Sequence, residues 1–141
     1  MPELSLIYPM LAMVLLTFAV AMVLFRARVR AVREGHTPIT YFRTFQGAEE
    51  PEFLIKATRH FANLFEVPTL FYAGCLAAMV AGVAGPLMVA LAWGYVIARL
   101  VHAMIHIGSN RIRRRMSAYF ISWLFLLAFW VVLGVTVATR H

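Results

Sequence analysis

The 141-residue sequence has few charged residues, and acidic residues are especially scarce. Asp and Glu together number six, against thirteen Lys and Arg, and charged residues make up only 13% of the chain. Hydrophobic residues make up 62%. This composition excludes an ordinary soluble domain and indicates a membrane protein. The single cysteine, Cys75, cannot form an intrachain disulfide and says little about the redox compartment.

Four apolar segments account for most of the chain, and each is close to the ~20 residues that a helix needs to cross a bilayer. They cover about residues 5–25, 60–83, 85–107 and 117–138. The apolar and polar alternation of membrane strands is absent. We therefore predict an all-α integral membrane protein, with a single four-transmembrane-helix bundle over residues 1–141. The helices are expected at about 5–30, 51–83, 85–107 and 116–138, with a polar loop at about 31–50.

Basic residues are concentrated in the first and third connections between these segments. The first holds Arg26, Arg28, Arg30, Arg33, Arg43, Lys56 and Arg59, and the third holds Arg111, Arg113, Arg114 and Arg115. The positive-inside rule places both connections in the cytoplasm and both termini on the opposite side. We expect a multi-pass protein of a bacterial inner membrane, in which most of these arginines set topology and contact lipid headgroups. Arginines placed at membrane ends argue against nucleic acid as a partner.

A second feature is a charge inside an apolar segment, where lipid does not tolerate one. Arg99 is followed by His102 and His106 at offsets of three and seven, so the three side chains share one helix face. An unpaired guanidinium at bilayer depth costs ~2.5 kcal/mol or more. Arg99 is therefore expected to face protein or water and to have a partner.

The second apolar segment supplies candidates for that partner. Arg59, Asn63 and Glu66 lie at offsets of zero, four and seven, and Glu66 is the only acid inside an apolar segment. We predict a structural ion pair between Glu66 and Arg99. Such a pair could serve only to set helix register, but the surrounding polar side chains exceed what that role needs and indicate a ligand site. Pro68 predicts a kink directly after this polar face.

An aromatic stripe marks the fourth apolar segment, where Phe120, Trp123, Leu127 and Trp130 recur at three- and four-residue spacing. Core or lipid contact explains the stripe most simply. The other interpretation is a groove that leads an apolar second substrate toward Arg115.

Histidines offer a further possibility, because His102 and His106 lie one turn apart and His60 is available on another helix. Two such histidines can share a metal ion. Thiolate ligands and a second carboxylate are missing from the set, so we expect no metal site.

The ordered motifs resemble one known family. They are Arg59-x3-Asn63-x2-Glu66-x-Pro68, then Arg99-x2-His102, a basic loop, and Arg115-x3-Tyr119. Together they are similar to the MAPEG family, membrane-associated proteins in eicosanoid and glutathione metabolism that include microsomal glutathione transferases. The resemblance covers nearly the whole chain. It implies a homotrimer in which glutathione, the co-substrate, binds between neighbouring subunits near the cytoplasmic side.

The resemblance also implies roles for individual residues. Arg115 would be catalytic and stabilise the glutathione thiolate. The residues implied to bind glutathione are Arg26, Arg30, Arg59, Asn63, Glu66, His102, His106, Arg111 and Tyr119. Arg26 or Arg30 would reach the site from the neighbouring subunit. An arginine-rich pocket with one carboxylate suits a ligand that carries two carboxylates, an ammonium and a thiol.

The implied function is a glutathione-dependent transferase or peroxidase acting on a small lipophilic electrophile, with membrane lipids and its own copies as further partners. Three positions depart from the glutathione-using members. Ala62 stands where a basic residue is frequent, His106 where tyrosine is frequent, and Met116 replaces a small polar residue. They motivate the alternative of a non-catalytic MAPEG-fold protein that binds lipid or another anionic ligand.

Overall fold

The computed structural model describes residues 4–109 and 111–140, and every regular element within these ranges is a helix. The elements are α1 (Ile7–Arg33), the short 3-10 helix η2 (Ile39–Arg43), α2 (Glu52–Asn63), α3 (Val67–Val80), α4 (Pro86–Ile107) and α5 (Ile112–Ala138). Four segments are long and apolar enough to cross a membrane: α1, α2 together with α3, α4, and α5. The predicted all-helical fold with four membrane-spanning segments is confirmed.

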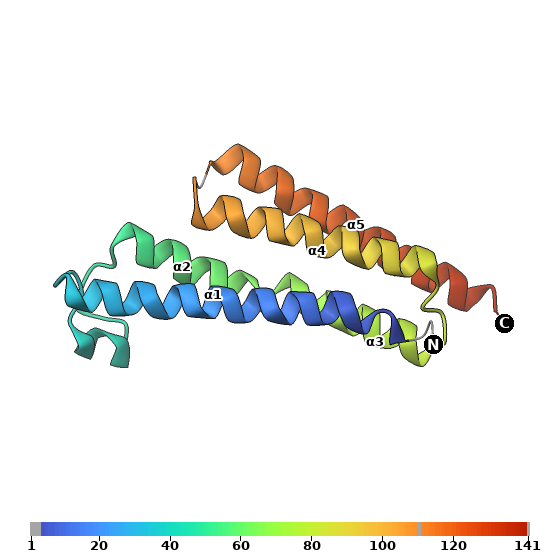
Figure 1. The fold of residues 1–141 in the computed structure, drawn as a ribbon, viewed down its shortest axis with the longest axis horizontal. Helices are drawn as coiled ribbons and strands as arrows, with labels where there is room; N and C mark the ends of the chain where they lie inside the picture. The colour runs from blue at the N-terminus through green and yellow to red at the C-terminus, as the bar shows by residue number, and fades with distance from the viewer. Residues whose placement is uncertain (1–3, 110, 141) are drawn as a thin grey trace.

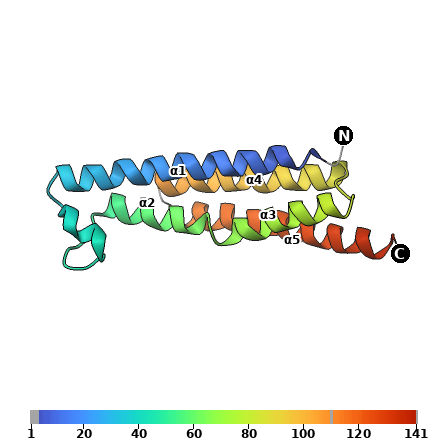
Figure 2. The same ribbon diagram turned by 90° about the horizontal axis from the view of Figure 1, so that it is seen from below.

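The spans run along one common direction (Figures 1 and 2). α4 and α5 form the most extensive helix pair, joined by the short connection after Ile107. α1 packs on α2, α3 and α4, while α3 also packs on α5. The η2 loop lies toward one end of the bundle, and the start of α1 and the end of α5 lie toward the other. This arrangement brings α2, α4 and the start of α5 together.

The second span is interrupted. α2 ends at Asn63, residues 64–66 form a turn, and α3 resumes at Val67 with Pro68 in its first turn. Pro68 has no N–H and cannot donate to the carbonyl four residues earlier, so it favours a helix start over a helix interior. The expected distortion at Pro68 is therefore present as a full break. Residues before and after the break do not share one helical face.

The apolar core lies between α1, α3, α4 and α5. Phe71 stacks on Tyr95 with ring centroids 4.6 Å apart and an interplanar angle of 19°. Phe129 and Met13 are buried against the same cluster. A second, smaller cluster joins α1 to α2 through Leu54 and its neighbours. The outward faces of the spans are apolar and exposed, as lipid-facing surfaces must be.

Close contact between α4 and α5 depends on Gly94. A Cβ built on Gly94 would lie 2.3 Å from the nearest carbon of the Phe125 ring. The ring of Phe125 therefore covers the place where any other residue would carry a side chain. A Cβ built on Gly134 of α5 would meet nothing within 4 Å.

These two glycines allow a matched stability test. Gly94→Ala is expected to destabilise the protein by about 1–2 kcal/mol, because overpacking displaces the Phe125 ring. Gly134→Ala is expected to be neutral or to stabilise by up to about 1 kcal/mol through helix propensity. Unfolding in mixed micelles of rising dodecyl sulfate content, followed by circular dichroism, measures both. Equal effects of the two substitutions would contradict the close contact at Gly94.

Candidate functional site

Six of the predicted site residues line one pocket of about 240 Å³ between α2, α4 and the start of α5. They are Arg59, Asn63, His102, His106, Arg115 and Tyr119, and Met116 completes the lining. We refer to this cavity as the polar pocket. The residues that α2 and α4 contribute are those that helical spacing placed on one face of each helix. The two helices pack with these faces toward each other.

Arg99 lies beside the polar pocket and is fully buried, with 0% of its surface exposed. Its Nη2 donates a hydrogen bond of 2.6 Å to Oδ1 of Asn63. Its guanidinium carbon lies 5.9 Å from the centre of the Tyr119 ring, within cation–π range. Nε and Nη1 have no hydrogen-bond partner among the described residues. A buried guanidinium with two unused donor nitrogens is suited to holding an anion.

The predicted contact between Glu66 and Arg99 is wrong. None of the salt bridges within residues 4–109 and 111–140 joins them, and the guanidinium binds Asn63 instead. The prediction treated the second span as one helix, which would put Glu66 on the face of Asn63. The break before Val67 places Glu66 at the start of α3, exposed and outside the lining of the polar pocket. Glu66 still attracts Arg99 electrostatically, but without contact.

His102 links α4 to the start of α5. Its Nδ1 lies 3.2 Å from the backbone carbonyl oxygen of Arg115. A carbonyl oxygen only accepts, so Nδ1 is the donor in this hydrogen bond. In the neutral ring, Nε2 is then left as an acceptor. His102 thus holds the first turn of α5 against the pocket and can accept a proton from a ligand group.

His60 is a site neighbour that sequence reasoning considered only as a possible metal ligand. It is fully buried, and its ring lies 4.8 Å from that of His106 and 5.7 Å from that of His102. Neither of its ring nitrogens has a hydrogen-bond partner among the described residues. The three-residue spacing of Leu54, Ala57 and His60, all buried, is the signal that could have placed it on the inner face of α2.

The His60 and His106 rings are stacked, with an interplanar angle of 29°, while the His102 ring is tilted against both of them. Among residues 4–109 and 111–140, no group of three histidine, cysteine or acidic side chains has an arrangement that could hold a metal ion.

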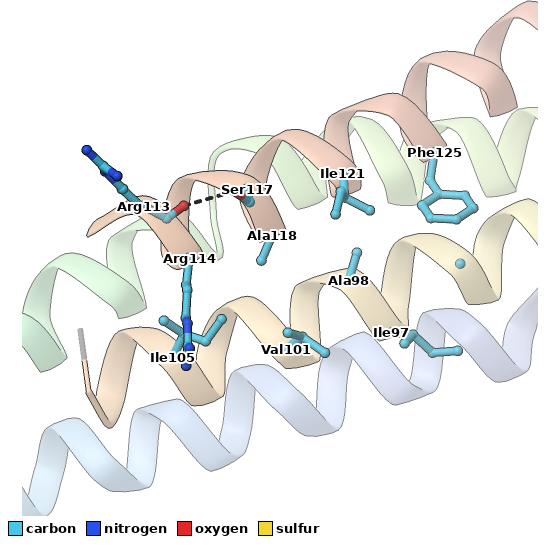
Figure 3. Close-up of a pocket in the computed structure, with 11 residues that line it drawn as sticks. Ile97, Ala98, Val101, Ile105, Arg113, Arg114, Ser117, Ala118, Ile121 and Phe125 are labelled. Carbon is cyan, nitrogen blue, oxygen red and sulfur yellow. Dashed lines mark hydrogen bonds between the residues drawn. The ribbon is translucent and has the colours of Figure 1, made fainter. Parts of the chain in front are cut away.

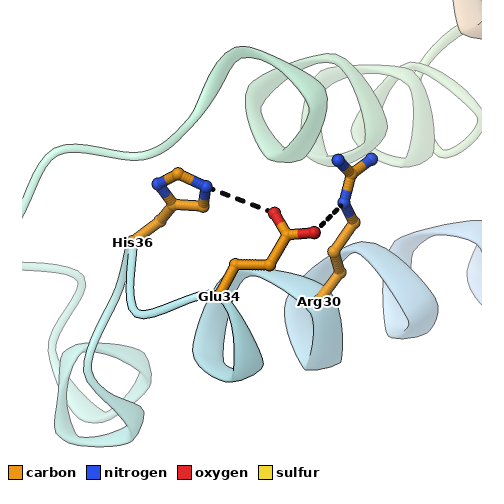
Figure 4. Close-up of polar contacts among 3 residues, drawn as sticks. All are labelled: Arg30, Glu34 and His36. Atoms are coloured by element: carbon orange, nitrogen blue, oxygen red, sulfur yellow. Dashed lines mark hydrogen bonds and ion pairs between the residues drawn. The ribbon is translucent and has the colours of Figure 1, made fainter.

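The remaining predicted site residues lie outside the polar pocket of this subunit. Arg26 and Arg30 line a separate hollow between α1 and α2, and Arg111 precedes α5 with an exposed side chain. Arg30 forms a 2.9 Å ion pair with Glu34, which His36 also contacts at 3.2 Å (Figure 4). The Arg30 guanidinium holds the pKa of the Glu34 carboxyl below its ordinary value.

The aromatic stripe of the fourth span lines an apolar groove of about 510 Å³ beside the polar pocket. Phe120, Trp123, Leu127 and Trp130 face it, together with Leu70 of α3 and neighbouring leucines. The indole N–H of Trp130 donates to the backbone carbonyl of Leu70 at 3.3 Å, which ties α5 to α3. Because Tyr119 lines the polar pocket and Phe120 lines this groove, the two cavities are neighbours along α5.

The fold and site define a multi-pass membrane protein with a cationic pocket beside an apolar groove. Comparison with family models identifies the class more closely, since the MAPEG family model matches residues 6–135. The chain belongs to the MAPEG family, and the predicted resemblance is confirmed. Membership places it among membrane proteins of glutathione or eicosanoid metabolism in general. Comparisons with curated proteins and with solved structures give no match.

Proposed function

We propose that the protein is a glutathione-dependent transferase or peroxidase that acts on a lipophilic electrophile. The observation that carries the proposal is the convergence of Arg59, Asn63, His102, Arg115 and Tyr119 on one pocket. These are the positions at which the motifs resemble glutathione-using members of the family.

The chemistry of the pocket fits the co-substrate. Behind the pocket lining, Arg99 and His60 carry buried nitrogen atoms without hydrogen-bond partners among the described residues, so polar donors surround the pocket. Arginine holds carboxylates well because its planar donors can bind both oxygens. In this proposal Arg59 binds a carboxylate, the buried Arg99 adds positive charge from behind Asn63, and Arg115 lies at the sulfur. A guanidinium beside a thiol favours the thiolate, which is the attacking nucleophile.

The size of the pocket supports a site shared between subunits. At about 240 Å³ it is smaller than the ~300–1,000 Å³ that is typical of ligand sites. We propose that a homotrimer completes it, with Arg26 or Arg30 of a neighbouring subunit closing the open side. In this arrangement the arginine-rich connections face the cytoplasm, as the positive-inside rule predicts. The apolar groove along Phe120 and Trp123 would bring the electrophile from lipid to the sulfur.

Calorimetric titration of reduced glutathione into detergent-purified protein tests the proposal. We expect saturable binding near one molecule per subunit. Arg59→Gln is expected to weaken it about tenfold or more, because a hydrogen bond to a charged group contributes ~1.5 kcal/mol or more. Arg33→Gln, which removes the same charge at the end of α1 away from the pocket, serves as the control and is expected to leave the affinity unchanged.

Two further outcomes have distinct meanings. Absence of binding at millimolar glutathione would contradict the proposal and favour the second candidate, a non-catalytic member of the family that binds lipid or another anion. Met116 favours this candidate, since it places a thioether in the pocket lining where glutathione-using members carry a small polar residue. Glu66→Gln tests the role that the resemblance implies, because weaker binding would show that this exposed carboxylate reaches the ligand.

A further inference from the structure

An apolar groove of about 570 Å³ runs along the outer face of the α4 and α5 pair (Figure 3). Ala98 and Val101 of α4 line it together with Ala118 and Ile121 of α5. Small residues on facing helices leave the space between the larger ones open. The groove shares no lining residue with the polar pocket or with the aromatic groove.

The length and position of the groove match one leaflet of a bilayer. Its lining on α4 extends from Gly94 to Ile105, which spans about 16 Å at 1.5 Å per residue. Half of the ~30 Å hydrocarbon core is about 15 Å. The ring of Phe125 closes the inner end of the groove over Gly94, and the outer end reaches the connection between α4 and α5.

Only the outer end of the groove is charged. Arg113 and Arg114 both line it and are both exposed. The side chain of Arg114 extends from α5 toward Ile105 of α4, across the mouth of the groove (Figure 3). No salt bridge within residues 4–109 and 111–140 involves either arginine. The side chain of Arg113 extends away from the groove in the same view, so the mouth carries the guanidinium of Arg114 (Figure 3). A guanidinium at the mouth of an apolar channel calls for an amphipathic anion.

We infer that this groove binds an anionic phospholipid of the adjacent leaflet, with one acyl chain along Ala98 and Ala118 and its phosphate at Arg114. The apolar lining accepts a chain, and the guanidinium accepts the headgroup charge. Coverage by a helix of a second copy is disfavoured, because it would seal Arg114 away from water without a counter-charge. The inference is independent of glutathione binding, since the two sites have no residue in common.

Native mass spectrometry tests this inference on the full chain. The protein is equilibrated in detergent with equal amounts of phosphatidylglycerol and phosphatidylcholine that carry identical acyl chains. We expect phosphatidylglycerol to be retained preferentially, at one molecule per subunit. Arg114→Gln is expected to lower that preference about fivefold, and Arg113→Gln, whose side chain points away from the groove, is expected to lower it less. Arg33→Gln combined with Arg43→Gln removes two charges elsewhere and is expected to preserve it.

A second pair of variants tests the acyl-chain channel. Val101 is 39% exposed, so Val101→Trp fills the groove with little effect on the core and is expected to reduce retention of both lipids. Val131→Trp places the same ring on the exposed face of α5 outside the groove and is expected to change nothing. Equal retention of the two lipids by the unmodified protein would overturn the inference. Displacement by free palmitate and not by phospholipid would also overturn it and assign the groove to a single-chain acid.

Discussion

Asn63→Leu is expected to lower the free energy of unfolding by about 2–4 kcal/mol, the largest stability effect predicted for this chain. The substitution removes the 2.6 Å hydrogen bond to Arg99 and leaves a fully buried guanidinium without its amide partner. The loss comes mainly from the buried guanidinium N–H left without an acceptor, since leucine itself fits an apolar helix. Unfolding in mixed micelles of rising dodecyl sulfate content measures the effect.

Two companion variants separate charge burial from packing. Asn63→Asp supplies an opposite charge at the same atoms and is expected to retain full stability. Asn63→Leu combined with Arg99→Met removes both polar partners, and we expect it to recover most of the loss, because paired polar groups can be replaced together by apolar ones at little cost. If Asn63→Leu alone leaves the free energy of unfolding unchanged, the hydrogen bond to Asn63 is not what stabilises the buried Arg99.

Arg115→Ala is expected to reduce turnover about 100- to 1,000-fold, which is the typical effect of removing one group that stabilises a developing or reacting anion. Arg115 lines the polar pocket at the start of α5, and the backbone carbonyl of the same residue accepts the hydrogen bond from His102. That hydrogen bond survives the substitution, because it uses the backbone. The fold of this segment is therefore expected to persist while the chemistry is lost.

The pH dependence gives a readout that a structural defect would not produce. In the proposed mechanism the guanidinium favours the thiolate of bound glutathione, so its removal is expected to raise the pKa of the thiol by about 1–2 units. In Arg115→Ala, both the thiolate fraction and the rate should then rise only at higher pH. Ultraviolet absorbance measures the thiolate fraction. Arg115→Lys keeps the positive charge and is expected to recover part of the thiolate fraction and part of the rate. Arg114→Ala removes the neighbouring charge outside the polar pocket and serves as the control. Unchanged turnover in Arg115→Ala would remove Arg115 from the mechanism.

Some residues of the site could be placed from the sequence, and others could not. Helical spacing on α4 correctly placed His102 and His106 on the face of Arg99, because a continuous helix has a fixed period. The same reasoning failed for Glu66, because the break between α2 and α3 interrupts that period. His60 was not placed in the site because its orientation depends on how α2 packs against α4. Arg30 forms an ion pair with Glu34, one helical turn away. The glutathione-binding role expected for Arg30 did not take this ion pair into account.

The sequence by itself determined the four membrane spans, the cationic face around Arg99, and the requirement that this arginine have a partner. Apolar length and the cost of a charge in lipid are properties of short segments, so they can be evaluated before the fold is known. Only the tertiary structure decided that the partner is Asn63, that His60 lies in contact with His106, and that a separate groove ends at Arg113 and Arg114. Those features depend on helix rotation and on the break at residues 64–66, which packing between distant segments sets.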